Sequence, residues 1–310
     1  MTDIILHQYA ESPFSEKVRL LLAYKQQSFK AVEIPVIMPK PDLMPLTGGY
    51  RKTPVLQVGA DIYCDSALAC KLVDRETGGD TIYPDDQLAM ITSVANWTDT
   101  FFFRVCVTVS FQPRALANVS LLSDPEAAAA FMADRAKLSE GSTALQMDLA
   151  LAQPYFDAHL RRLDVQLAPG GFLFGDKPTI ADFSTYHCLW FVHNNEVLHD
   201  LFEPFENVRA WMAGMAAFGP GDMTEISGQD ALDIAKHAAP SEQHKLAPVD
   251  EGTLVLGETV EVMPIDYGFQ PVRGQLQLTS LEEIVVRRND DAVGDVCVHF
   301  PRLGFQVNHV

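Results

Sequence analysis

The first 83 residues alternate short apolar runs with capped helical patterns, and this alternation restricts the segment to an α/β arrangement. Ile4 to Leu6 form the first run. Ser12 and Pro13 then provide a helix cap and a proline at the first helical position, where its missing N–H is no loss. Further strands are predicted at 31–37 and 53–58, and helices at 13–24 and 65–76. The resulting βαβ…ββα order is typical of a thioredoxin-like domain.

The segment 84–239 shows helical spacing throughout and predicts an all-α bundle. Thr179 and Asp182 have the spacing of an N-terminal capping box, and the helix after them is almost wholly apolar, which predicts a central position in the bundle. The predicted helices are 87–104, 126–138, 154–167, 179–192 and 207–218.

The segment 240–310 changes to short β-type runs separated by glycine and proline. Five such runs, which begin at residues 253, 260, 274, 284 and 296, predict a small antiparallel barrel or curled sheet of unknown role. The chain is therefore expected to contain three domains, with bounds at 1–83, 84–239 and 240–310.

The charge of the chain excludes several kinds of partner. Its 310 residues include 23 Lys and Arg against 41 Asp and Glu, for a net charge of −18. Such a surface repels phosphate backbones and anionic lipid, so neither nucleic acid nor a membrane is expected as a partner. The first residues show no secretory signal, and the five cysteines form no CxxC pair. We therefore expect a cytoplasmic protein without a metal site.

Four local motifs together resemble the glutathione S-transferase family. They are SPFSEKVR at 12–19, RKTPVL at 51–56, DSA at 65–67 and the capping box at 179–182. Their order and separation match the family, and the resemblance covers residues 1 to about 220. It implies glutathione as co-substrate and a homodimer. The strand-rich segment lies outside the common two-domain pattern.

Ser12 is the predicted catalytic residue, because the resemblance places the catalytic serine or cysteine at the amino end of the first helix. A free thiol has a pKa of about 8.5, so a hydroxyl and the positive end of a helix are needed to favour its anion. Ser12 would stabilise the thiolate without being the nucleophile. Two alternatives stay open: Ser12 as a plain helix cap, and Tyr9 as the donor to the sulfur. Serine in place of cysteine disfavours disulfide exchange.

The resemblance also implies the residues that hold glutathione. Thr53, before a cis peptide bond to Pro54, would pair with the peptide backbone as an added strand does. Asp65 would pair with the γ-glutamyl ammonium, and Ser66 with the neighbouring carboxylate. Lys40 and Lys52, with Arg51, form a basic spot, and either lysine suits the glycyl carboxylate, although both could be solvated loop lysines.

The second substrate is expected between the two halves, against a wall that includes Trp97, Phe101, Phe102, Phe103 and Arg104, although such aromatic residues also suit a core or a dimer contact. Three functions follow from the resemblance. The first is a glutathione transferase acting on an unknown electrophile. The others are a non-catalytic glutathione-binding or regulatory protein, and a glutathione-dependent peroxidase or lyase.

Overall fold

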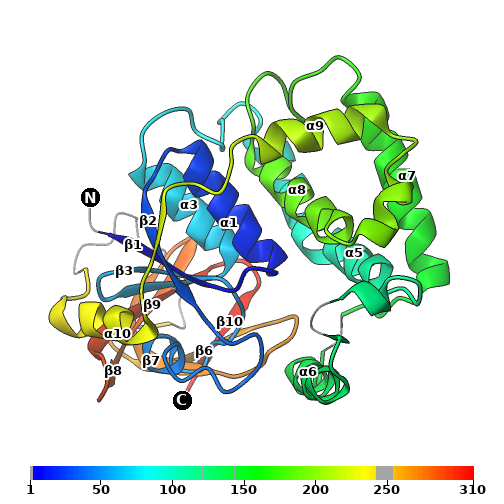
Figure 1. Ribbon diagram of the computed structural model, residues 1–310. Coiled ribbons are helices and arrows are strands. Elements are labelled where there is room, and N and C mark those ends of the chain that lie inside the picture. The colour runs from blue at the N-terminus through cyan, green and yellow to red at the C-terminus, as the bar shows by residue number, and fades with distance from the viewer. Residues whose placement is uncertain (1–2, 120–121, 143, 242–253) are drawn as a thin grey trace.

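A computed structural model describes residues 3–119, 122–142, 144–241 and 254–310, which form a sheet-centred half and a helical half (Figure 1). The sheet contains ten strands in the order β10-β6-β7-β8-β9-β4-β3-β1-β2-β5. None of the described helices has the length and apolar composition that crossing a bilayer requires.

The N-terminal segment has the predicted thioredoxin-like arrangement. It contains β1 (Ile4–Gln8), α1 (Pro13–Tyr24), β2 (Phe29–Glu33), α2 (Met44–Thr47), β3 (Val55–Val58), β4 (Asp61–Cys64) and α3 (Ser66–Glu76). Strand β1 pairs in parallel with β2 and antiparallel with β3, which in turn pairs antiparallel with β4. Helix α1 buries Val18, Leu21 and Leu22 because their spacing places them on one face.

The helical half confirms the predicted helices from residue 88 to residue 216, whereas residues 223–225 form a strand inside the segment 84–239 that was predicted to be helical throughout. Its elements are α4 (Leu88–Trp97), a π-helical turn (Thr98–Phe102), α5 (Phe103–Ser110), two short 3₁₀ turns (Leu116–Asn118 and Glu196–Leu201), α6 (Pro125–Leu138), α7 (Leu149–Gln166), α8 (Ile180–His193) and α9 (Glu206–Ala216). The capping box of Thr179 and Asp182 is formed, and α8 is buried along nearly its whole length. In Figure 1, α6 lies apart from α5, α7, α8 and α9, below them and beside the sheet half.

The C-terminal strands continue the N-terminal sheet. They are β6 (Thr259–Pro264), β7 (Val272–Thr279), β8 (Glu283–Asp290), β9 (Gly294–Pro301) and β10 (Phe305–His309). Their mutual pairing is antiparallel, as predicted, whereas β9 pairs in parallel with β4. Tyr50 packs against Phe300 and Phe305, so the two segments share one hydrophobic core.

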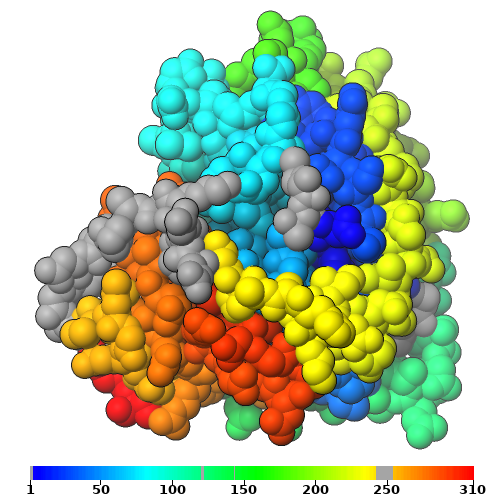
Figure 2. All heavy atoms as spheres, turned by 90° about the vertical axis from the view of Figure 1, so that its left-hand side faces the viewer, coloured from blue at the N-terminus to red at the C-terminus, as the bar shows by residue number. Residues whose placement is uncertain are grey.

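Two elements before residue 240 also belong to the sheet half. Strand β5 (Met223–Glu225) pairs with β2, and α10 (Gly228–His237) begins with a capping box of Ser227 and Asp230. Figure 2 shows α10, in yellow, beside the orange strands of the C-terminal segment, and it packs on β9 and β2. The domain bounds at 83 and 239 stay predictions, but the sheet is continuous across both.

Several predicted element bounds are wrong. Strand β2 ends at Glu33 instead of residue 37, and the predicted helix 87–104 is interrupted by the π-helical turn and continues to Ser110. Helix α7 begins at Leu149, capped by Asp148, and contains Pro154 within it. The run at 253–256 forms no strand at the described residues 254–256, and residue 253 lies outside the described ranges. No range was predicted for α2, β4, β5, α10 or β10.

A buried histidine holds the junction between the two parts of the sheet. His299 of β9 lies between Asp61 of β4, whose Oδ1 is 3.1 Å from Nε2, and Glu283 of β8, which contacts Nδ1. Its ring stacks on Tyr63 with centroids 4.2 Å apart. Burial opposes the imidazolium, but hydrogen bonds to the two carboxylates outweigh it and raise the pKa of His299.

We predict that His299→Gln destabilises the protein by about 3 kcal/mol at mildly acidic pH, because two buried carboxylates lose their cation. The pKa of His299 is higher in the folded than in the unfolded protein. Its contribution to the free energy of unfolding is therefore complete below the pKa of the unfolded state and is lost as pH rises through the pKa of the folded state. Urea unfolding between about pH 6 and pH 9 should therefore show a wild-type advantage that shrinks as pH rises. The exposed His237→Gln is the control. A difference that is constant with pH would contradict the prediction.

Candidate functional site

A cavity of about 120 Å³ opens where three parts of the chain meet. The N-terminal segment contributes Tyr9, Ser12, Lys40, Lys52 and Thr53 among others, the helical half contributes Phe103 and Arg135, and the β6–β7 loop (265–271) contributes Tyr267. Ligand pockets commonly measure about 300–1,000 Å³, so this cavity matches part of a tripeptide rather than all of it.

Ser12 lies at the amino end of α1 and faces this cavity. The residue is only 2% exposed, and its Oγ accepts a hydrogen bond from the backbone N–H of Ser15 at 3.2 Å, as a helix cap does. Tyr9 lines the same cavity, and burial raises the pKa of its phenol and keeps it protonated, although Ser12 opposes this shift. Both candidate donors therefore line the same cavity.

Lys40 is a buried cation beside this pair. Its Nζ donates to Thr53 Oγ1 at 3.0 Å and lies 5.8 Å from the centroid of the Tyr9 ring. Within the described ranges, no carboxylate forms an ion pair with Lys40. Burial, reinforced by the charges of Arg135 and Arg51, lowers the pKa of Lys40 to about 8. Lys40 thus offers an uncompensated charge to an anion in the cavity.

Two arginines add to the positive charge of the cavity. Arg51 and Arg135 both contact Asp134, the former at 2.8 Å, and the two Nε atoms are buried without a hydrogen-bond partner in the described part of the chain. Arg135 also donates to the backbone carbonyl of Val36 at 3.2 Å, which fastens α6 to the N-terminal segment. One carboxylate therefore serves two guanidinium groups.

Lys52, the second predicted lysine, is occupied by the protein itself. Its Nζ is 2.6 Å from Asp266 Oδ1 and 3.8 Å from the centroid of the Tyr267 ring. Both partners belong to the β6–β7 loop, so the strand-rich segment covers the predicted binding residues from one side. Lys40 is consequently the lysine that remains available to a ligand.

The other predicted binding residues lie outside the cavity lining, apart from Thr53. The Thr53–Pro54 peptide bond is cis, which confirms that prediction. Asp65 caps α3 by accepting from the N–H of Ala67 at 2.8 Å, and Ser66 is the first residue of that helix. Burial raises the pKa of the Asp65 carboxyl, although Lys52 and Lys17 oppose this effect.

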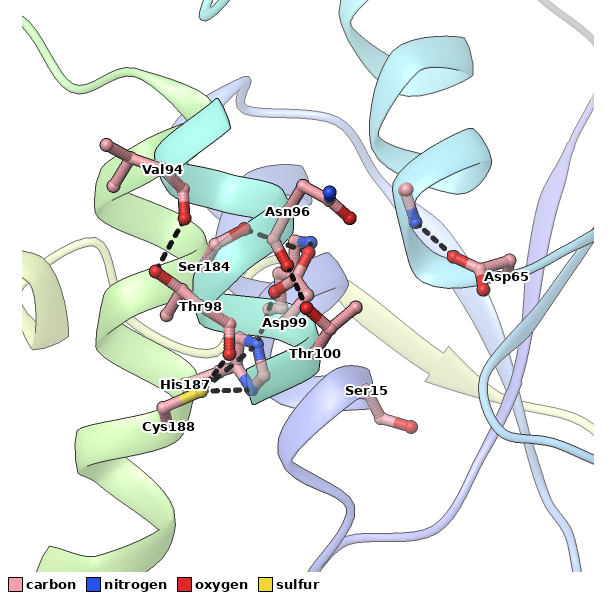
Figure 3. Close-up of polar contacts among 12 residues, drawn as sticks. Ser15, Asp65, Val94, Asn96, Thr98, Asp99, Thr100, Ser184, His187 and Cys188 are labelled. Atoms are coloured by element: carbon pink, nitrogen blue, oxygen red, sulfur yellow. Dashed lines mark hydrogen bonds and ion pairs between the residues drawn. The ribbon is translucent and has the colours of Figure 1, made fainter. Parts of the chain in front are cut away.

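A buried polar cluster fixes α1 against the helical half (Figure 3). Asp99, in the π-helical turn, accepts from Lys17 Nζ at 2.6 Å, from Ser184 Oγ at 3.2 Å, and pairs with His187 Nε2 at 2.9 Å. Burial would raise the pKa of Asp99, but the charge of Lys17 and the His187 hydrogen bond lower it to about 2. The Phe14 ring packs 4.7 Å from that of His187, so the cluster also supports one wall of the cavity.

The five residues predicted to form a wall for the second substrate lie in different environments. Of these five residues only Phe103 lines the cavity, against the Phe14 ring at 4.6 Å. Phe102 is fully buried in the core, Trp97 is 38% exposed, and Arg104 lies 5.8 Å from the Tyr267 ring.

Sequence reasoning missed Arg135, Leu138 and Tyr267 as lining residues. The first two lie in a helix that was predicted, but no pattern indicates which side of that helix meets the N-terminal segment. Tyr267 lies in the loop between β6 and β7, and nothing in the sequence relates it to the lining residues of the N-terminal segment, Tyr9 to Thr53. Among the described residues, no group of three His, Cys, Asp or Glu side chains could hold a metal ion.

Two models of known protein families match this chain, one in each half of the molecule. The model for the glutathione S-transferase N-terminal domain matches residues 6–81, and that for the C-terminal domain matches residues 126–214. Comparison with curated proteins finds no match.

Solved structures agree with this assignment. A GST-like protein from Pseudomonas syringae is 35% identical, covers 100% of both chains and superposes with a TM-score of 0.84. A glutathione S-transferase from Rhodospirillum rubrum F11 is 18% identical over 69% of this chain and 88% of its own, with a TM-score of 0.53. One from Methylobacillus flagellatus KT, with glutathione bound, is 19% identical over 69% and 95%, with a TM-score of 0.50. On the two family models and the full-length P. syringae match, this chain belongs to the glutathione S-transferase family.

Proposed function

We propose that the cavity binds the cysteinyl-glycyl end of glutathione and that the protein joins the sulfur of glutathione to an electrophilic small molecule. The supporting observation is the position of Ser12: its hydroxyl lies at the amino end of a twelve-residue helix, in the lining of a cavity. The same lining includes Lys40, which has no carboxylate partner among the described residues. The γ-glutamyl end would lie outside this cavity, toward Asp65 and Ser66 at the start of α3.

The proposed chemistry requires the thiol of glutathione to ionise near neutral pH. Lowering a thiol pKa by about two units requires close to 3 kcal/mol of preferential interaction with the anion. A hydrogen bond to a charged group contributes about 1.5–3 kcal/mol, and a helix amino end adds about 0.3–1 kcal/mol. Ser12 together with α1 can therefore supply an effect of this size without another cation.

Tyr9 and Ser12 would act together rather than as alternatives. Both side chains line the cavity, and a phenol of Tyr9 that donates to Ser12 Oγ would leave the proton of Ser12 free to point at the sulfur. Because the Tyr9 pKa is raised, its phenol keeps the proton that this arrangement needs. In this scheme Ser12 is the catalytic residue and Tyr9 is a positioning residue.

Lys40 would bind the glycyl carboxylate. Its ammonium is buried and lacks a carboxylate partner among the described residues, so a ligand anion would relieve the desolvation that lowers its pKa. Lys52 is bound to Asp266 and would act only indirectly, by holding the β6–β7 loop.

The relatives support a transferase, because the structures that share this fold include proteins described as glutathione S-transferases, one of them with glutathione bound. We also expect a cytoplasmic homodimer. The exposed apolar side chains of α4, Leu88, Met90 and Trp97, offer a surface for such a contact.

Ser12→Ala should raise the pKa of the bound thiol by about one unit or more and lower kcat/KM about tenfold or more at neutral pH, because the thiolate loses its donor. Ultraviolet difference spectra of bound glutathione against pH would measure the pKa. Ser93→Ala is the control, since this exposed serine of α4 lies outside the cavity lining. Equal pKa values in wild type and Ser12→Ala would reject the assignment.

Lys40→Met should weaken binding of S-methylglutathione, which has no ionisable thiol, by about tenfold, the effect of losing roughly one charged hydrogen bond. Wild-type affinity should fall as pH rises through about 8, because the ammonium that attracts the carboxylate loses its proton. Calorimetric titrations should show a weaker pH dependence for Lys40→Met. The exposed Lys137→Met should behave as wild type, and if Lys40→Met does as well, Lys40 is not the anion site.

A further inference from the structure

The cavity around Ser12 is too small and too enclosed to admit a tripeptide as it stands. Its volume is about 120 Å³, whereas ligand pockets commonly measure about 300–1,000 Å³. The lining residues Ser12, Lys40 and Arg51 are only 2%, 2% and 6% exposed. A molecule of that size can therefore reach the Ser12 hydroxyl only after one of the lining elements has moved.

Much of the lining belongs to parts of the chain that are packed in a core. Tyr9 and Ser12 lie between β1 and α1, whose apolar side chains are buried in the sheet half. Phe103 begins α5, which packs on α7 and α8. Tyr267 lies in a loop whose two ends are neighbouring strands of the sheet. Large movements of these elements would disturb a hydrophobic core or the sheet.

Helix α6, which contributes Arg135 and Leu138 to the lining, is attached differently. Of its fourteen residues only Leu138 is buried, and the helix lies apart from α5, α7, α8 and α9 (Figure 1). Phe131 stacks on Phe111, which follows α5, with ring centroids 6.5 Å apart. Because its movement would expose few apolar side chains, α6 can leave the cavity at a lower free-energy cost than a core helix can.

One carboxylate of α6 holds the helix against the N-terminal segment. Asp134 Oδ1 accepts from the backbone N–H of Met38 at 3.2 Å, and Asp134 Oδ2 lies 2.8 Å from Arg51 Nη2. Arg135 contacts the same Oδ2 and donates to the carbonyl of Val36 at 3.2 Å. Burial opposes the charged form of Asp134, but hydrogen bonds from Arg135 and Met38 outweigh it and lower the pKa of this carboxyl. Asp134 is therefore ionised at neutral pH.

The carboxyl end of α6 has a separate attachment. The carbonyl of Leu138 accepts from the N–H of Gly268 at 2.9 Å, and Ser142 Oγ, beyond the helix, donates to the carbonyl of Asp266 at 2.7 Å. Both contacts are made to the β6–β7 loop. Release of Asp134 would leave these contacts in place, so the helix would pivot about its carboxyl end.

We propose that α6 is a lid over the cavity and that Asp134 is the latch that holds this lid shut. Opening admits the ligand. Closing returns Arg135 to the lining, and this cation has a buried Nε without a hydrogen-bond partner in the described ranges, so it can face a bound anion. The identity of that anion as glutathione rests on the proposed function, whereas the lid itself does not.

A thiol in the place of the Ser12 hydroxyl measures lid opening without a ligand. The five native cysteines are buried, so the bulky reagent dithiobis(nitrobenzoic acid) should label the thiol that Ser12→Cys introduces first, and only while the lid is open. Adding Asp134→Asn keeps the size of the latch side chain and removes its charge. We expect labelling to become about 10- to 100-fold faster, the range of a lost hydrogen bond to a charged group. Asp157→Asn, at an exposed position of α7, is the matched control and should leave the rate unchanged.

Hydrogen exchange gives a second measure in protein that keeps Ser12. Asp134→Asn should speed exchange of the α6 amides by about 10- to 100-fold and leave the amides of the buried helix α8 at the wild-type rate. Faster exchange in both helices would mean general destabilisation and would overturn the latch. Equal labelling rates with Asp134→Asn and Asp157→Asn would overturn it as well. Labelling of the Ser12→Cys protein as fast as that of free cysteine would show an open cavity and remove the lid.

S-methylglutathione distinguishes failure of the lid from failure of the proposed function. When bound, it should protect the introduced thiol from labelling and slow exchange of the α6 amides, because the closed lid places Arg135 over its carboxylate. Protection of the thiol without slower exchange in α6 would overturn the closing role of Arg135. If Asp134→Asn speeds labelling but calorimetry detects no binding of S-methylglutathione to the wild type, the lid stands and the proposed function falls.

Discussion

The parallel pairing of β9 with β4 is the constraint on which the arrangement of the active region depends. It continues the N-terminal sheet into the C-terminal strands, and the antiparallel order of β6 to β9 then places the β6–β7 loop at the cavity. The pairing is reinforced by His299 between two carboxylates and by the shared packing of Tyr50, Phe300 and Phe305. The strand-rich segment is therefore a structural part of the N-terminal half. The full-length match with the P. syringae protein includes this segment as well.

The cavity concentrates positive charge in a protein whose net charge is −18. Lys40, Arg51, Lys52 and Arg135 line it, while Asp134 and Asp266 are the acidic partners that the structure gives them. Buried positive charges that outnumber their carboxylate partners lower the stability of the protein unless a ligand supplies the missing anion. This excess accounts for how a strongly acidic protein could attract an anionic tripeptide, and it locates the attraction at Lys40, the lysine without a carboxylate partner in the described ranges.

The sequence predicted the residues whose role depends on their own local structure. Ser12 follows a strand and precedes a proline, so its place at the head of α1 can be read directly, and the cis bond before Pro54 followed from the family resemblance. The capping box at Thr179 and the strand-rich character of the C-terminal segment were recognised for the same reason. Element bounds failed where tertiary packing overrides local pattern, as in the π-helical turn that places Asp99 beside Lys17 and His187.

By itself the sequence determined the structural class of each segment, the family, and the alternative candidates Ser12 and Tyr9, because capping, periodicity and motif spacing act over a few residues. Only the tertiary structure decided that Lys52 is bound to Asp266 while Lys40 stays available, that Arg135 reaches the cavity, and that Tyr267 forms part of its wall. These contacts join residues that are 214 positions apart in the case of Lys52 and Asp266. Such contacts depend on which strands become neighbours in the sheet. The alternation of apolar and polar residues within a strand predicts which side chains are buried, but it does not predict the neighbouring strand.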